Sequence, residues 1–117
     1  MRQGNRAMAA HLFPLAAQSF NRLIDRAPGF AEAWNRRATL HFLMGNYGAS
    51  IEDIEKTLEL EPRHFGALSG LGLIMLDLDR PETALRSFEA ALALHPYLPG
   101  ARTQVIELHR RLEGDPI

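Results

Sequence analysis

Cysteine is absent from the 117 residues of this sequence. Its absence excludes disulfide bonds, thiolate nucleophiles and cysteine-ligated zinc or iron–sulfur sites. An excess of charge of one sign is also missing, because 13 Lys and Arg residues stand against 14 Asp and Glu residues, for a formal net charge of −1. A strong basic excess is typical of proteins that bind nucleic acid or an anionic membrane surface, so neither partner is expected. Long apolar runs and period-two alternation are missing as well, so we expect no membrane span and no half-buried strand.

A repeat is the main feature that the sequence does contain. Pro28, Pro62 and Pro96 are 34 residues apart, and each closes a segment with helical apolar periodicity. Small residues recur at the same spacing in two sets: Gly4, Ala38 and Gly72 form the first, and Ala16, Ser50 and Ala84 form the second. Large apolar residues recur in a third set, which consists of Phe20, Ile54 and Phe88. Each unit predicts two helices whose apolar faces cannot be buried within one hairpin. A fixed period of this length is typical of a helical solenoid in which the hairpins stack and the small residues allow close packing.

The helices are expected at 2–10, 14–26, 31–44, 48–60, 65–78, 81–94 and 100–112. Gly45 fits a helix C-terminus that needs a positive φ. Asp79 is the better of two candidates, with Arg80, for the N-cap of the helix that begins at Pro81. The apolar residues expected to face inward in the last helix are Val105, Ile106, Leu108 and Leu112.

The residues of the second and third units match a known family pattern. The matching positions are Trp34, Ala38, Tyr47, Ser50 and Pro62, and then Leu71, Gly72, Ala84, Phe88, Ala91 and Pro96. The chain therefore resembles tetratricopeptide repeat (TPR) proteins from Met1 to about Arg111, and it is also similar to a group of small bacterial TPR proteins. This resemblance implies an all-α fold, a right-handed α-α superhelix of helical hairpins with three TPR units and a C-terminal capping helix.

The expected domain is a single one at 1–113, with units 1–30, 31–64 and 65–98, a capping helix at 99–113 and a tail at 114–117. The first unit is truncated, because it has no residue equivalent to Trp34. Members of the similar bacterial group are often longer and exported. We expect a cytoplasmic location by default, and a periplasmic one if the chain is a fragment of a longer exported protein.

Polar residues that could suggest chemistry have simpler explanations. The five histidines contain no HExxH or i, i+4 pair, so no metal site is expected. The acidic run of Glu52, Asp53, Glu55, Glu59 and Glu61 is predicted to be a solvated helix face. Arg37 and His41 stand where the family usually has a leucine and a tyrosine. No convergent polar groups indicate a nucleophile, so we expect no enzyme, no catalytic residue and no cofactor.

The resemblance also implies a binding groove, because the first helices of TPR units line a concave channel that contacts partner segments. The corresponding residues here are Asn5, Glu32, Asn35, Arg36, Thr39, Phe42, Leu43, Ser69, Leu73 and Leu76. Some relatives hold a C-terminal carboxylate with several cations in this channel. Here Arg36, helped by Asn35 and Asn5, is the one cation in that set. An amphipathic helix or an apolar segment is therefore the better match.

The function predicted from these features is a non-catalytic protein–protein interaction module that binds a partner peptide or helix in its groove. The alternative is a self-association module, a homodimer that uses the apolar groove or the truncated first repeat. A further alternative for Leu73 and Leu76 is that the last helix or a second copy of the chain covers them.

Overall fold

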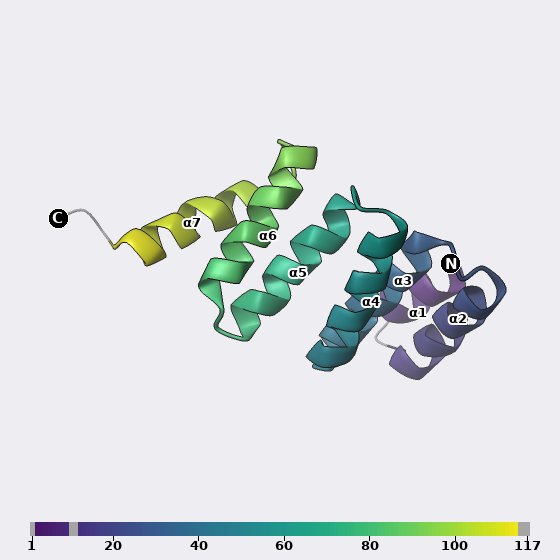
Figure 1. Cartoon of the computed structure of the whole chain (residues 1–117). Coiled ribbons are helices and arrows are strands. Elements are labelled where there is room, and N and C mark those ends of the chain that lie inside the picture. The colour runs from purple at the N-terminus through teal and green to yellow at the C-terminus, as the bar shows by residue number, and fades with distance from the viewer. Residues whose placement is uncertain (1, 10–11, 115–117) are drawn as a thin grey trace. The chain divides into compact units, whose positions relative to one another are not determined.

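Seven α-helices and no strands make up the part of the chain that the computed structural model describes, residues 2–9 and 12–114. The helices are α1 (Arg2–Ala9), α2 (Phe13–Arg26), α3 (Ala31–Leu43), α4 (Tyr47–Leu60), α5 (Phe65–Asp77), α6 (Pro81–Leu94) and α7 (Ala101–Glu113) (Figure 1). Every predicted boundary that falls on described residues is within one residue of the observed one. Ala10 and three residues of the predicted tail, 115–117, lie outside the described residues.

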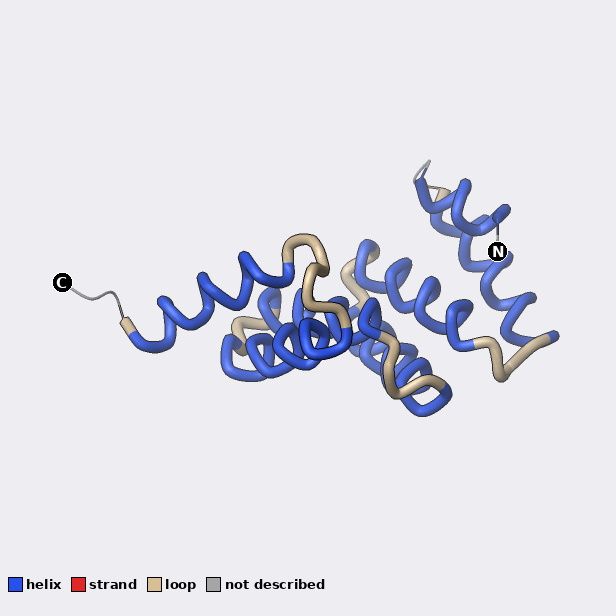
Figure 2. Tube along the Cα trace, turned by 90° about the horizontal axis from the view of Figure 1, so that it is seen from above, coloured by secondary structure: helices blue, strands red, loops and turns tan. Residues whose placement is uncertain are grey.

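Two compact units divide the chain, Met1–Pro62 and Arg63–Ile117, and each is described here by itself. The first unit contains the hairpins α1–α2 and α3–α4, with α2 packed against α3. The second unit contains the hairpin α5–α6, and α7 packs along α6. Short loops join α3 to α4 and α5 to α6 (Figure 2). The expected arrangement of three units in a single domain stays a prediction.

Small residues on the first helix of a hairpin face a large residue on the second. A Cβ atom added to Gly4 would lie 2.6 Å from the ring of Phe20, and one added to Gly72 would lie 2.7 Å from the ring of Phe88. Both rings are buried. The packing role predicted for these glycines is confirmed, because only a residue without a side chain lets each ring approach its neighbouring helix so closely.

The helices α3 and α7 each pack against the preceding hairpin through one buried leucine. Leu40 of α3 is buried against Ala16 and Phe20 of α2. Leu108 of α7 is buried against Ala84 and Phe88 of α6.

The last helix corrects two predictions. Ile106 and Leu112 were expected to face inward, yet they are 65% and 36% exposed. The buried stripe of α7 contains Ala101 and Leu108, with Val105 packed against the same cluster. Ile106 follows Val105 and is turned by about 100° around the helix axis, which places it outside that stripe.

The turns within the second and third hairpins each contain a residue with a positive φ. Gly45 has the positive φ that was expected, +78°, and Asp79, 34 residues later, has a φ of +56°. The prediction that Asp79 caps α6 is wrong, because the N-cap is Arg80 and no side chain caps that helix end. Asp79 instead ends α5, and its Oδ1 accepts a hydrogen bond of 2.6 Å from Nη2 of Arg111.

Candidate partner-binding surfaces

The α3 surface, as we name it, is a set of six predicted groove residues that recur at three- and four-residue spacing on α3. Its members are Glu32, Asn35, Arg36, Thr39, Phe42 and Leu43. Residues of the same helix outside this set, namely Ala33, Ala38 and Leu40, are buried. The helix therefore buries one side, whereas the residues of the α3 surface are half-buried or, in the case of Leu43, exposed.

The first turns of the α3 surface are polar and contain one ion pair and one side-chain hydrogen bond within the helix, although Nε of Arg36 has no hydrogen-bond partner among the described residues. Oε1 of Glu32 lies 3.0 Å from Nε of Arg36, and Oγ1 of Thr39 donates to the carbonyl oxygen of Asn35 over 3.2 Å. A half-exposed pair of this kind contributes about 0.3–0.5 kcal/mol, so it can be displaced. An incoming carboxylate would nevertheless compete with Glu32 for the one cation of this surface. This geometry disfavours a carboxylate clamp at Arg36.

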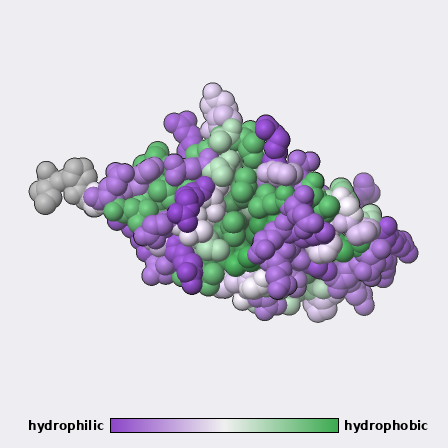
Figure 3. All heavy atoms as spheres, in the orientation of Figure 1, coloured by the Kyte–Doolittle hydropathy of each residue, from purple (hydrophilic) through white to green (hydrophobic). Residues whose placement is uncertain are grey.

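The last turn of the α3 surface is apolar. The ring of Phe42 lies 5.8 Å, centroid to centroid, from the ring of Tyr47 at the start of α4. Leu43 follows and is 48% exposed. Apolar side chains reach the solvent among charged ones on the face of the molecule drawn in Figure 3. An exposed leucine beside a packed aromatic pair is a suitable contact for an apolar side chain of a partner.

The α5 surface, as we name the second set, consists of Ser69, Leu73 and Leu76 at four- and three-residue spacing on α5. Leu73 is 41% exposed. Leu76 differs, because it packs against the buried cluster that contains Phe88 and Leu108. Leu73 is therefore the apolar residue of this surface that is available for contact, while Leu76 also supports the core of its own unit.

Asn5 lies on α1, in the same unit as the α3 surface, and its Oδ1 is buried with no hydrogen-bond partner among the described residues. The ten predicted groove residues thus fall on three helices, and the three α5 residues belong to the other unit. Their union into one groove stays a prediction.

A partly buried polar cluster joins α2, α3 and α4, and the sequence analysis missed it. Nε and Nη2 of Arg37 each donate to a carboxylate oxygen of Asp53 over 2.8 Å, and Nη1 donates to Oδ1 of Asn21 over 2.9 Å. Nε2 of His41 lies 3.6 Å from Oδ2 of Asp53. Asp53 is only 4% exposed, so the prediction of a solvated position is wrong for this residue. The prediction of a solvated position is confirmed for the four other acidic residues of the run, which are all exposed. One of them, Glu59, also pairs with Lys56 over 3.4 Å.

The cluster could have been found from two signals in the sequence. Arg37 and His41 replace apolar family residues, so they need an anionic neighbour if they are inward. Asp53 shares a helix face with Ser50, Ile54 and Thr57, all of which are buried. The bidentate hydrogen bond to Asp53 raises the pKa of Arg37, the charges of Asp53 and Asp25 act in the same direction, and burial opposes them. The hydrogen bonds of Arg37 link α3 to α2 and α4.

Metal-ligand and membrane features were searched in the same residues. Within 2–9 and 12–114, no group of three or more His, Asp or Glu side chains is placed to hold a metal ion. None of the helices described is both long and apolar enough to cross a bilayer.

Comparison with known proteins gives matches along the whole chain. The family model of the tetratricopeptide repeat matches residues 31–64. A TPR repeat-containing protein of Rhizobium etli is 40% identical over 115 residues, which are 98% of this chain and 56% of that protein. The chain thus spans about half the length of that relative. The Hsp70-Hsp90 organizing protein of Triticum aestivum is 26% identical, and the match covers 97% of this chain but 20% of that protein.

Solved structures show the same fold. The first TPR of Spaghetti (RPAP3), bound to the HSP90 peptide SRMEEVD, superposes with a TM-score of 0.89 at 19% identity and covers 97% of this chain and 90% of its own. The TPR2B domain of yeast Sti1, in a complex with pHsp70, has a TM-score of 0.81 at 18% identity, with coverage of 95% and 90%. At these identities the similarity shows the fold, an all-α helical repeat solenoid.

Proposed function

Because this chain is a tetratricopeptide repeat protein, we propose that it is a non-catalytic binding module that holds a segment of a partner protein on its first helices. The contact residues would be those of the α3 surface and the α5 surface. Two proteins of the same fold support the proposal, since one is bound to an HSP90 peptide and the other is in a complex with pHsp70. The proposal assigns no chemical step to the chain.

The observation that carries the proposal is the division of the α3 surface into a polar and an apolar part. Leu43 is exposed beside the Phe42–Tyr47 pair, whereas Arg36 is already paired with Glu32. A partner gains most from apolar contact with Leu43 and less from charge. An amphipathic helix or an apolar segment therefore fits this surface, with one acidic residue of the partner oriented by Arg36.

A pair of matched double variants tests the two surfaces. Peptides are first selected from a random library on the wild-type chain and their dissociation constants are measured. Leu43→Lys with Leu73→Lys places a charge on each surface and should weaken these peptides about tenfold or more. Met44→Lys with Leu78→Lys is the control, because these residues are 47% and 39% exposed, close to 48% and 41%, but lie outside both surfaces. Equal weakening by the two variants, or none by the first, would contradict the assignment.

Self-association is the second candidate, and the exposed leucines favour it too. If the surfaces serve a second copy of the chain, the wild type sediments as a dimer at micromolar concentration without any ligand. The Leu43→Lys and Leu73→Lys variant should then be a monomer, while the control remains a dimer. A wild type that is monomeric throughout the concentration series rules out this candidate.

A further inference from the structure

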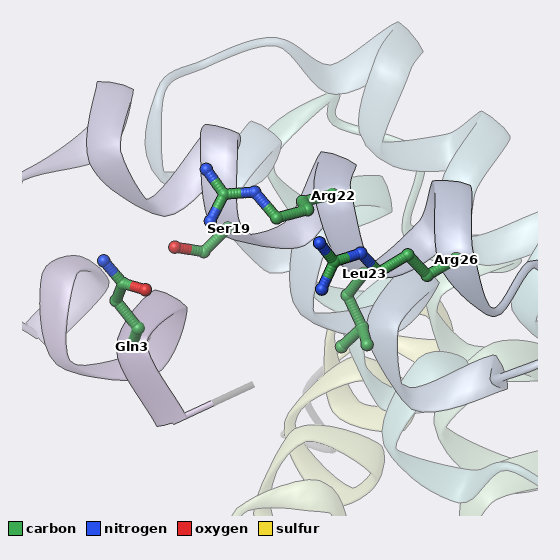
Figure 4. A pocket seen from close by; sticks show the side chains of 5 residues that line it. All are labelled: Gln3, Ser19, Arg22, Leu23 and Arg26. Atoms are coloured by element: carbon green, nitrogen blue, oxygen red, sulfur yellow. The ribbon is translucent and has the colours of Figure 1, made fainter.

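A pocket on the first hairpin has a different chemistry from the two surfaces above. It has a volume of about 150 Å³ and is lined by Gln3 of α1 and by Ser19, Arg22, Leu23 and Arg26 of α2. Figure 4 shows the amide of Gln3 turned toward Ser19 and both guanidinium groups on one side of α2. A water molecule occupies about 30 Å³ in the liquid, so the pocket has room for an oxyanion with its hydrogen-bond donors around it.

The charge of this hairpin is strongly positive although that of the whole chain is −1. Residues 1–30 contain the arginines at positions 2, 6, 22 and 26 and a single acidic residue, Asp25. Four positive charges against one negative charge leave an excess of +3. Arg22 and Arg26 are exposed, and neither forms an ion pair with a carboxylate in the described part of the chain. The pocket therefore has two cations whose charge is not neutralised.

In the second hairpin, carboxylates of the protein itself neutralise the cations at the equivalent positions. Shifting Gln3, Ser19 and Arg22 by 34 residues gives Arg37, Asp53 and Lys56. There, Asp53 accepts two hydrogen bonds of 2.8 Å from Arg37, and Lys56 lies 3.4 Å from Glu59. In the first hairpin Ser19 takes the position of Asp53, and Asp25, at the position of Glu59, forms no ion pair with Arg22 in the described part of the chain. A carboxylate at the position of Asp53 must therefore come from another molecule.

The surface beside the pocket indicates what kind of molecule carries that carboxylate. Leu15 lies one turn before Ser19 on the same stripe of α2 and is 38% exposed. An apolar side chain two helical turns before Arg22 suits a protein segment that has both an apolar residue and an acidic one. It offers nothing to a small inorganic anion.

We propose that the pocket of Gln3, Ser19, Arg22 and Arg26 binds an Asp or Glu side chain of an acidic protein segment. The two guanidinium groups donate charge-assisted hydrogen bonds to the carboxylate, and the Gln3 amide and the Ser19 hydroxyl donate to the same group. Leu15 contacts the apolar residue of the segment. This site is separate from the α3 and α5 surfaces and does not depend on the function proposed for them.

The test uses the full chain and two defined peptides, a labelled twelve-residue peptide with two glutamates among leucines and alanines and its twin with glutamine in their place. The wild type should bind the glutamate peptide at least about tenfold more tightly than the twin. Arg22→Gln with Arg26→Gln should remove this difference. Arg63→Gln with Arg102→Gln takes the same charge from exposed arginines of the other unit and should leave it intact.

A second variant pair imitates the internal solution of the second hairpin. Ser19→Asp supplies the carboxylate at the position of Asp53 and should weaken the glutamate peptide about tenfold, while Thr103→Asp, on an exposed residue of the other unit, should change it less than about twofold. Circular dichroism confirms that each variant is folded. Equal loss with both arginine pairs, equal loss with both aspartate variants, or displacement of the glutamate peptide by equimolar inorganic phosphate would each overturn the proposal.

Discussion

Adding one methyl group at Gly72 tests the central packing rule of the hairpins. A Cβ atom at this position would lie 2.7, 2.8 and 2.8 Å from Cζ, Cε1 and Cε2 of Phe88. The ring is 1% exposed and belongs to a closed cluster with Ala84, Ala101 and Leu108, so it cannot swing into solvent. Gly72→Ala must therefore displace either the ring or α5.

The expected size of the effect follows from two opposing terms. Overpacking a well-filled core costs about 1–3 kcal/mol. Alanine is more favourable than glycine inside a helix by about 1 kcal/mol. Since three ring atoms lie within 3 Å of the new methyl group, overpacking should prevail, and we expect a net loss of about 1–2 kcal/mol in the free energy of unfolding.

The protein itself contains the combination that should restore the fit. At the positions equivalent to Gly72 and Phe88 the second hairpin has Ala38 and Ile54, both 2% exposed. Phe88→Ile alone removes part of the ring volume and should cost about 1–3 kcal/mol. The double variant Gly72→Ala with Phe88→Ile should lie within about 1 kcal/mol of the wild type, so the two changes should couple by about 2 kcal/mol.

Urea unfolding followed by circular dichroism at 222 nm measures all four proteins of this cycle. Gly48→Ala is the control, because Gly48 also lies in a helix but a Cβ atom there would have no neighbour within 4 Å. It should be neutral or gain up to about 1 kcal/mol. A Gly72→Ala variant as stable as this control, or a double variant that loses the sum of the single losses, would refute the argument.

Further variants address single sites. Asp53→Asn leaves a partly buried guanidinium without its anion and should lower the free energy of unfolding by about 3 kcal/mol, measured by urea unfolding; a loss below 1 kcal/mol would mean that the cluster is not coupled to folding. Leu108→Ala should cost about 2–5 kcal/mol and Ile106→Ala, at an exposed position of the same helix, under about 0.5 kcal/mol, so equal losses would contradict the observed orientation of α7. Gly45→Ala should lower the melting temperature, because alanine has a Cβ penalty at a φ of +78° that glycine lacks; an unchanged or higher melting temperature would refute this argument.

The order and limits of the helices could be predicted because the relevant signals are local and occur three times. Pro28, Pro62 and Pro96 follow the second helices at a constant spacing, and Gly45 supplies the positive φ between α3 and α4. Each signal acts through the backbone of the residue itself. For that reason the boundaries were predicted to within one residue, and the buried small residues were also predicted.

The polar interior of the second hairpin could not be predicted in the same way. The buried face of α4 consists of Ser50, Asp53, Ile54 and Thr57, so three of its four residues are polar. These polar side chains can be buried because each has a hydrogen-bond partner. Oγ of Ser50 donates to the backbone carbonyl oxygen of Ala38 over 2.7 Å, and Oγ1 of Thr57 donates to the backbone carbonyl oxygen of Asp53 over 2.8 Å. A search for apolar periodicity passes over such a face, since its burial depends on partners in other segments.

The candidate sites were predictable only as positions on a helix. The α3 surface lies on one face as expected, but the pairing of Glu32 with Arg36, the packing of Leu76 and the basic pocket of the first hairpin depend on side-chain conformations and on neighbouring helices. A repeat sequence predicts which side of a helix is free. It does not predict how the charges on that side are already used.

The single tryptophan has a consequence for how this chain can be followed in solution. Trp34 donates from Nε1 to the carbonyl oxygen of Pro28 over 2.9 Å, and its ring lies 5.0 Å from the guanidinium carbon of Arg37 and 5.8 Å from the ammonium nitrogen of Lys56. Its fluorescence therefore reports on the junction of the first two hairpins, which belongs to the first unit. Emission and ellipticity, recorded on one sample during unfolding, should coincide if the two units melt as a single cooperative block and separate if they melt in succession. The natural sequence thus contains a built-in optical reporter for one of its two units.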